Sequence, residues 1–202
     1  MSEYYLVRPV VKDYYLVMQN RNESVAAKTE QIERKFTGRV IAVDVETVIL
    51  PNGHRTDLEL IQHPGGAAAV VLDEQNRVCL LRQYRHAAGD WLWELPAGKI
   101  EQNEAPLLTA QRELAEEAGV HARQWQELGP IFSSPGVFRE VIHLYLARDI
   151  TPTQVMHEAA EVIEIGWINF EQAIKWAISG EITDAKTLIG LFRVASAVDV
   201  DQ

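Results

Sequence analysis

Short apolar runs separated by turn residues occupy the first third of the chain. Residues 4–18 are rich in tyrosine, valine and leucine, and residues 31–62 also have the composition of strands. Asn52-Gly53 lies between two of these runs, which is a strong signal for a hairpin turn. The pattern predicts a small antiparallel β-subdomain over residues 1–60, followed by a second domain over residues 61–202.

The second domain combines strand-like runs with three segments of helical character. Residues 67–72 and 77–84 are predicted to form one buried hairpin, because a polar turn separates two apolar runs. The remaining predicted strands are residues 91–95, 125–128, 141–147 and 162–168, and the predicted helices are residues 104–119, 170–179 and 185–197. In the first helix Asn103 is the expected N-cap and Gly119 the expected C-cap. The elements follow no regular βαβ order, which favours a mixed-sheet α/β sandwich or an α+β fold.

Charge and composition narrow the classes of function. The chain has 202 residues and a formal net charge of -10, so nucleic acids and anionic membrane surfaces are not expected partners. No apolar run is long enough to span a bilayer and no signal sequence is evident, so a cytoplasmic protein is expected. Cys79 lies in an apolar run and is expected to be buried and inert, and the histidines lack zinc-ligand spacing.

Three glutamates crowd one side of the first predicted helix. Glu113, Glu116 and Glu117 fall within an arc of roughly 100°, given 3.6 residues per turn. Like charges at these spacings repel, and a hard divalent cation such as Mg²⁺, with Mn²⁺ as a possible substitute, would offset the repulsion. The alternative is an ordinary solvated face, with Arg112 paired to Glu116 or reaching back to Glu104.

The wider spacing around these glutamates favours the metal. Gly98, five residues, Glu104, seven residues and then Arg112 lead into the block Arg-Glu-Leu-Ala-Glu-Glu-Ala-Gly-Val. This stretch resembles the Nudix box, G-x5-E-x7-R-E-U-x-E-E-x-G-U with U aliphatic, at every defined position. The resemblance implies a Nudix-type α/β/α sandwich with a mixed sheet. It also implies hydrolysis of a nucleoside diphosphate linked to another group.

The resemblance assigns roles to the residues of the box. The implied metal ligands are Glu113, Glu117 and the backbone carbonyl of Ala97, and Glu116 joins them when more than one ion binds. Glu116 is thereby also implied in catalysis. Arg112 and Glu104 would hold the loop and the helix in register, and Gly98 would allow the loop to approach closely.

Residues outside the box resemble those of the ADP-ribose pyrophosphatase branch. The run Glu-Leu-Pro-Ala-Gly-Lys-Ile-Glu at residues 94–101 looks like the entry to the box in that branch, and Pro135 lies sixteen positions after Gly119. The implied reaction is Mg²⁺-dependent hydrolysis of ADP-ribose to AMP and ribose 5-phosphate. The alternatives are a broader pyrophosphatase for ADP- or GDP-sugars and a non-catalytic Nudix-fold ligand sensor. Members of the branch are typically homodimers, so the subdomain over residues 1–60 is expected to dimerise.

Several residues are candidates for binding the substrate. Arg85 resembles the family arginine that contacts the substrate phosphate or base, although a surface arginine is the alternative. Arg55 is expected to act similarly from the other subunit, and Glu140, after the Pro135 loop, to hydrogen-bond the adenosine part. Arg139 stands where many relatives carry an acidic residue. Tyr14 or Tyr15 could stack on adenine or belong to the core.

The general base is expected on a loop after the late strand at residues 141–147. Similar enzymes use a glutamate there to deprotonate the attacking water, and this loop carries Glu158, Glu161 and Glu164. Glu164 falls within the next predicted strand, so Glu161 is favoured by position and Glu158 is second. The alternative is that both are solvent-exposed loop acids.

Overall fold

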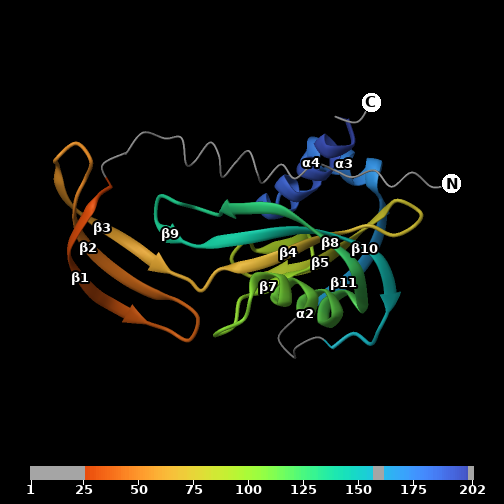
Figure 1. Cartoon of the computed structure of the whole chain (residues 1–202), viewed down its shortest axis with the longest axis horizontal. Helices are drawn as coiled ribbons and strands as arrows, with labels where there is room; N and C mark the ends of the chain where they lie inside the picture. The colour runs from red at the N-terminus through yellow and green to blue at the C-terminus, as the bar shows by residue number, and fades with distance from the viewer. Residues whose placement is uncertain (1–25, 157–161, 200–202) are drawn as a thin grey trace.

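The structure is a computed structural model that describes residues 26–156 and 162–199. The strand predicted at residues 4–18, with Tyr14 and Tyr15, and the candidate bases Glu158 and Glu161 lie outside the described residues. Figure 1 shows a separate β-sheet at one end of the molecule and a layered body of sheets and helices at the other.

The separate sheet is built mainly from residues before the box. Its strands are β1 (Lys28–Thr37), β2 (Ala42–Ile49), β3 (Arg55–Gln62) and β9 (Phe138–Arg139), in that order. The first three are antiparallel neighbours, and Gly53 turns the chain between β2 and β3 with a φ of 82°, which confirms the hairpin predicted at Asn52-Gly53. Strand β9 runs parallel to β3, so a segment of the later chain completes this sheet. The division at residue 60 stays a prediction.

Two sheets form the centre of the layered body. The first has the order β7 (Ala97–Lys99), β4 (Gly66–Val71), β10 (Val141–Pro152), β8 (Val120–Phe132), and the second has the order β11 (Ile163–Asn169), β5 (Arg77–Arg85), β6 (Asp90–Glu94). Strand β4 is parallel to β10, whereas the other pairs are antiparallel. The first sheet is therefore mixed, as predicted.

The predicted hairpin of residues 67–72 and 77–84 is wrong in its pairing. Both runs are strands, β4 and β5, but they belong to different sheets and meet through the isolated bridge of Leu72 with Val78. A strand has two hydrogen-bonding edges. Those of β4 are taken by β7 and β10, and those of β5 by β6 and β11. Because residues 67–72 and 78–81 are continuously apolar, their pattern identifies buried strands without indicating their partners.

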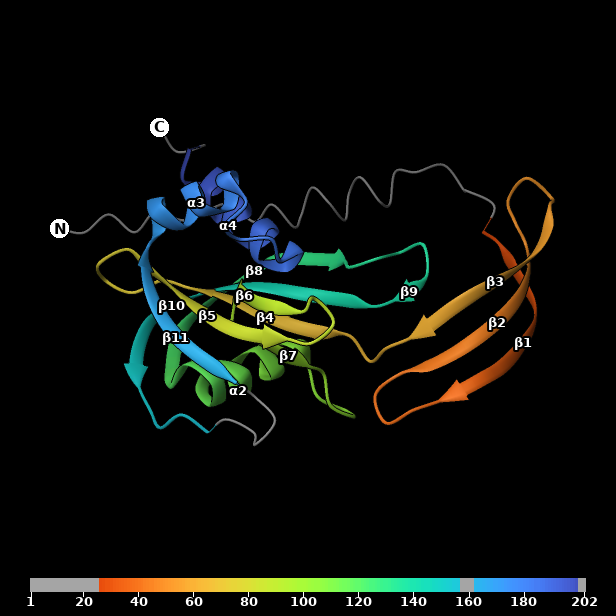
Figure 2. The same cartoon turned by 180° about the vertical axis from the view of Figure 1, so that it is seen from behind.

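Helices cover both faces of this centre. Helix α2 (Pro106–Ala118) lies on one side, and α3 (Phe170–Ser179) and α4 (Ala185–Asp199) lie on the other, as Figures 1 and 2 show. Alternate residues of β4 face the two layers: Ala68 and Val70 pack in the cluster with α3 and α4, and Ala69 and Val71 in the cluster with α2. This arrangement is the predicted α/β/α sandwich. Among the helices in the described ranges, none combines the length and apolar character that crossing a lipid bilayer requires.

The ends of α2 fix where its glutamates point. The helix begins at Pro106, which needs no partner for an N–H, and Ala105 is its N-cap. The predicted cap Asn103 is wrong, because this residue has a φ of 64° and lies in the preceding turn. Gly119 ends the helix with a φ of 65° and donates its N–H to the carbonyl of Ala115, as predicted.

Candidate active site

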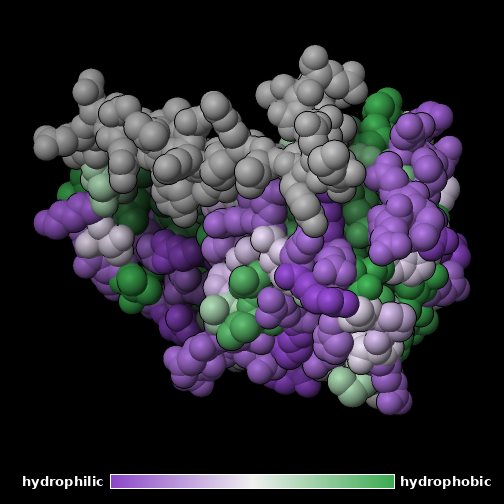
Figure 3. Space-filling view, turned by 45° about the vertical axis from the view of Figure 1, so that its right-hand side comes forward, coloured by the Kyte–Doolittle hydropathy of each residue, from purple (hydrophilic) through white to green (hydrophobic). Residues whose placement is uncertain are grey.

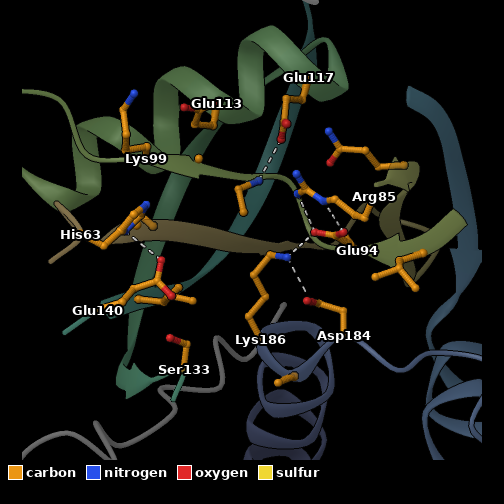
Figure 4. Close-up of a pocket in the computed structure, with 18 of the residues that line it drawn as sticks. His63, Arg85, Glu94, Lys99, Glu113, Glu117, Ser133, Glu140, Asp184 and Lys186 are labelled. Atoms are coloured by element: carbon orange, nitrogen blue, oxygen red, sulfur yellow. Dashed lines mark hydrogen bonds and ion pairs between the residues drawn. The ribbon is translucent and has the colours of Figure 1, made fainter. Parts of the chain in front are cut away.

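A cavity of about 680 Å³ lies between α2, the first turn of α4 and the ends of several strands. Its polar lining residues include His63, Arg85, Glu94, Lys99, Arg112, Glu113, Glu116, Glu117, Glu140, Asp184 and Lys186. Figure 4 shows side chains from both helical layers meeting in this space. Figure 3 shows one face of the molecule, on which hydrophilic residues predominate and hydrophobic ones form separate patches.

Two nearly buried carboxylates of α2 lie directly against strand β7, which carries Ala97 and Gly98. Glu117 is 3% exposed, and its Oε2 accepts a hydrogen bond of 2.9 Å from the N–H of Ala97. Glu113 is 9% exposed, and a Cβ added at Gly98 would lie only 1.8 Å from its Oε1. The glycine is therefore required here because the carboxylate occupies the space of a side chain.

Arg112 joins the acidic side of α2 to the loop that precedes this helix. Its Nη1 donates to Glu113 Oε1 at 2.7 Å and to Glu116 Oε2 at 3.1 Å. Its Nε and Nη2 donate to the two oxygens of Glu104 at 2.9 and 3.1 Å, and Nη2 also donates to the carbonyl of Lys99 at 3.3 Å. These bonds hold the loop on the helix, which is the role that the box resemblance implies for Arg112 and Glu104.

The charges of this network shift the pKa values of both partners. Hydrogen bonding by Arg112 lowers the pKa of Glu104 from its usual 4.5 to about 2. In return, the hydrogen bond to Glu104, followed by those to Glu113 and Glu116, raises the pKa of Arg112 despite partial burial. Glu104 and Arg112 therefore both carry their full charges at neutral pH.

The donor set of α2 fits a divalent cation that prefers oxygen ligands. In the described ranges, no three acidic, histidine or cysteine side chains converge into a ready metal cluster. However, one cationic nitrogen, Arg112 Nη1, already lies between oxygens of Glu113 and Glu116. Glu117 lies one helical turn after Glu113 and accepts the N–H of Ala97, the residue before Gly98. Hard cations such as Mg²⁺ and Mn²⁺ use carboxylate and carbonyl oxygens of this kind.

A second charged cluster lies across the cavity. Arg85 donates from Nε and Nη2 to the two oxygens of Glu94 at 2.7 and 2.9 Å. Lys186, from the first turn of α4, also pairs with Glu94, and its Nζ lies 3.1 Å from Asp184 Oδ2 (Figure 4). Burial opposes ionisation of Glu94, but the hydrogen bond from Arg85 and the charge of Lys186 outweigh it, so the pKa of Glu94 is lowered.

Another wall of the cavity is formed by the segments that connect the two ends of the molecule. His63 Nδ1 lies 2.9 Å from Glu140 Oε1, and the imidazole ring packs 5.4 Å from the ring of Phe138. Arg139, beside Glu140, instead pairs with Glu46 of the separate sheet at 2.9 and 3.2 Å. Glu140 therefore faces the cavity while Arg139 ties β9 to β2.

Most of the predicted site residues come together in this cavity. Its lining contains Ala97, Glu113, Glu116, Glu117, Arg85 and Glu140. Two others lie outside it. Arg55 pairs with Glu30 on the separate sheet at 2.8 Å, and Pro135 lies exposed in the loop after β8. The expected contribution of Arg55 from a second subunit stays a prediction, as does the role of Pro135.

Sequence reasoning missed the contribution of α4. Asp184 caps this helix, since its Oδ2 accepts a 3.0 Å hydrogen bond from the N–H of Thr187, three residues on. That capping pattern is readable in the sequence and would have placed Lys186 in the first helical turn. Nothing in the local pattern indicates that this turn faces Glu94, which is 92 positions away in the chain.

The carboxylates of α2 and the cations across the cavity suit a hydrolase that acts on phosphate esters with a divalent cation, and comparison with known proteins identifies the family. The NUDIX domain model matches residues 62–188. The chain is 35% identical over 167 residues to the ADP-ribose pyrophosphatase of Bacillus subtilis (strain 168), covering 82% of this chain and 90% of that one. It is 34% identical over 171 residues to the methanol dehydrogenase activator of Bacillus methanolicus, covering 84% and 91%.

A solved structure described as an ADP compounds hydrolase shares the fold. It aligns with a TM-score of 0.76 over 89% of this chain and 98% of that one, at 18% identity. The chain therefore belongs to the Nudix family of pyrophosphohydrolases. The resemblance to the ADP-ribose pyrophosphatase branch, predicted from residues 94–101 and Pro135, is also confirmed.

Proposed function

We propose that this protein hydrolyses the pyrophosphate bond of ADP-ribose to AMP and ribose 5-phosphate with the help of a divalent cation. Mg²⁺ is the expected ion and Mn²⁺ a possible substitute. The observation that carries the proposal is the placement of Glu113, Glu116 and Glu117 on the wall of a cavity that Arg85 enters from another side. Carboxylates can hold cations there, and an arginine can hold phosphate oxygens.

The reaction breaks one phosphorus–oxygen bond and forms another. The oxygen of a water molecule attacks one phosphorus atom, the bridging oxygen leaves with the other phosphate, and the water proton passes to a base. A bound divalent cation neutralises phosphate oxygens and makes a coordinated water more acidic. Glu113, Glu116, Glu117 and the carbonyl of Ala97 are the groups that would hold it.

The other residues of the cavity bind and orient the substrate in this proposal. The guanidinium edge of Arg85 that Glu94 leaves free takes non-bridging phosphate oxygens, while Glu140 accepts hydrogen bonds from the adenosine part. Glu161 is the proposed base, with Glu158 as the second candidate. The cavity volume of about 680 Å³ lies within the range of roughly 300–1,000 Å³ typical of ligand sites.

The test is a substrate panel with the purified chain and Mg²⁺. ADP-ribose, ADP-glucose, GDP-mannose, NADH and diadenosine polyphosphates are compared by kcat/KM, and the products are identified by chromatography. We expect ADP-ribose to give the highest value and to yield AMP and ribose 5-phosphate. A higher value for GDP-mannose or ADP-glucose would support the broader nucleotide-sugar pyrophosphatase, and tight binding without turnover would support a ligand sensor.

A Glu117→Gln variant provides the inactive control for this substrate panel. The amide oxygen can still accept the hydrogen bond from Ala97, so the fold is retained, but a charged metal ligand is lost. We expect kcat to fall by roughly two orders of magnitude or more, because a catalytic cation contributes several kcal/mol. Glu171→Gln, on the exposed surface of α3, is the control and should retain full activity. Near-normal Mg²⁺-dependent turnover by Glu117→Gln would contradict the assignment.

The assembly and location also belong to the proposal. A homodimer in the cytoplasm is expected, with the sheet of β1, β2 and β3 at the interface and Arg55 reaching the partner's cavity. Light scattering after size exclusion measures the mass directly. A monomer at catalytic concentrations that is fully active would contradict the contribution of Arg55 from a second subunit.

A further inference from the structure

The first turn of α4 binds two consecutive residues just before the Nudix box, Glu94 and Leu95. Lys186 pairs with Glu94, and the hydroxyl of Thr187 accepts a 2.9 Å hydrogen bond from the N–H of Leu95. The same hydroxyl donates to Asp184 Oδ2 at 2.6 Å, and Thr187 is fully buried. Because the turn is capped and bonded at both residues, Lys186 reaches Glu94 from a fixed backbone.

Glu94 is a buried carboxylate that pairs with two positively charged side chains. Arg85 occupies both of its oxygens, and Lys186 shares Oε2. The side chain of Glu94 is 3% exposed, so these bonds are not exchanged freely for water. A buried charge is stable only when its hydrogen-bonding capacity is filled. Here Lys186 donates an additional hydrogen bond to Oε2 of Glu94, beyond the two from Arg85.

The orientation of Arg85 depends on the orientation of that carboxylate. A bidentate arginine–carboxylate pair is planar, so the guanidinium plane follows any rotation of its partner. Glu94 accepts from Nε and Nη2, so Nη1 and the second hydrogen of Nη2 form an edge that Glu94 does not engage. Arg85 and Lys186 both line the cavity, but Arg85 is 42% exposed, whereas Lys186 is only 12% exposed and has both Glu94 and Asp184 within ion-pair distance. The arginine is thus the group available to a ligand.

We propose that Lys186 is a positioning residue for the diphosphate group of the substrate: it fixes the Glu94 carboxylate and, through it, the edge of Arg85 that faces the cavity. This inference rests on the proposed function, because it assumes that a diphosphate occupies the cavity. Lys186 also lines the cavity, but its Nζ lies within ion-pair distance of Glu94 and Asp184, so its proposed role is to position Arg85 and not to bind the substrate. Its effect therefore passes entirely through Arg85.

The test is a double-mutant cycle with Lys186→Met and Arg85→Met. We expect Lys186→Met to raise KM about tenfold, the size of losing one charge-assisted hydrogen bond, with a change in kcat of less than about threefold. Lys186→Arg should recover most of the loss, because it restores a cationic donor. In the Arg85→Met background, Lys186→Met should change KM by less than about twofold, because there is no guanidinium left to orient.

Controls separate positioning from a general loss of fold. Lys175→Met removes an exposed lysine of α3 and should leave KM and Tm unchanged. If Lys186→Met does not fold, Lys186→Gln, which keeps one donor without the charge, takes its place in the cycle. An unchanged KM in the single variant, or an equal rise in KM with and without Arg85, would overturn the inference.

For each variant of the cycle, calorimetry also measures the Kd for α,β-methylene ADP, which does not depend on turnover. If ADP-ribose is not hydrolysed but the tenfold and twofold ratios appear in Kd, the proposed function fails and the role of Lys186 stands. If ADP-ribose is hydrolysed but neither KM nor Kd responds to Lys186→Met, the role of Lys186 fails alone.

Discussion

Replacing Gly98 with alanine should displace a single carboxylate and little else. The added Cβ would lie 1.8 Å from Oε1 and 2.0 Å from Cδ of Glu113. Reaching an ordinary contact of 3.4 Å requires that the carboxylate move by about 1.6 Å. Gly98 is not among the described glycines with a positive φ, so alanine brings no backbone strain of its own. The clash is therefore relieved by rotating the glutamate side chain.

A movement of this size is large for a metal ligand. Mg²⁺ holds its oxygen ligands at about 2.1 Å with little tolerance, and a misplacement of roughly 1 Å at an active site can cost about a hundredfold in rate. We expect Gly98→Ala to lower kcat for ADP-ribose by about a hundredfold and to raise the Mg²⁺ concentration needed for half-maximal activity. The off-rotamer side chain should lower Tm by no more than about 5 °C.

The assay is steady-state release of AMP across a Mg²⁺ titration, with thermal unfolding measured in parallel. Glu113→Ala is the matched background, because without that carboxylate the alanine at position 98 has nothing to displace. Residual turnover should then be the same with either residue at position 98. Normal turnover and an unchanged Mg²⁺ requirement in Gly98→Ala would refute the view that Glu113 acts from its position against this glycine.

Three further predictions follow from other parts of the molecule. The pKa of Glu104 is lowered from 4.5 to about 2, so its ion pair with Arg112 stabilises the fold above pH 4.5 and is lost as the pH falls toward 2. The Tm difference between wild type and Arg112→Met should therefore shrink between pH 4.5 and pH 2. Leu114 of α2 is fully buried against β4 and β5, so Leu114→Ala should lower the free energy of unfolding, measured in urea, by about 2–5 kcal/mol, and a smaller loss would contradict tight packing there. Glu161→Gln should lower kcat more than Glu158→Gln at saturating Mg²⁺, and the reverse order would move the base to Glu158.

Local patterns in the sequence predicted the elements better than their partners. The turn at Asn52-Gly53 and the helix end at Gly119 were predictable because each depends on backbone conformations that few residues adopt. The pairing of residues 67–72 with 77–84 was wrong because apolar strands buried on both faces give no register signal. Asn103 has the right chemistry for a cap, but Pro106 starts the helix three residues later.

The difference between local patterns and long-range pairing also explains why only the part of the candidate site on β7 and α2 was predictable. The three residues of β7 are each approached by a different side chain of α2, namely Glu117, Glu113 and Arg112 in that order. The two segments are close in the chain, so an insertion or deletion between them would break all three contacts, and the constraint is visible as fixed spacing. The pairing of Lys186 with Glu94 joins segments 92 positions apart and tolerates any length between them. The sequence therefore predicts the acidic wall of the cavity, and only the folded chain reveals how the arginine that faces it is held.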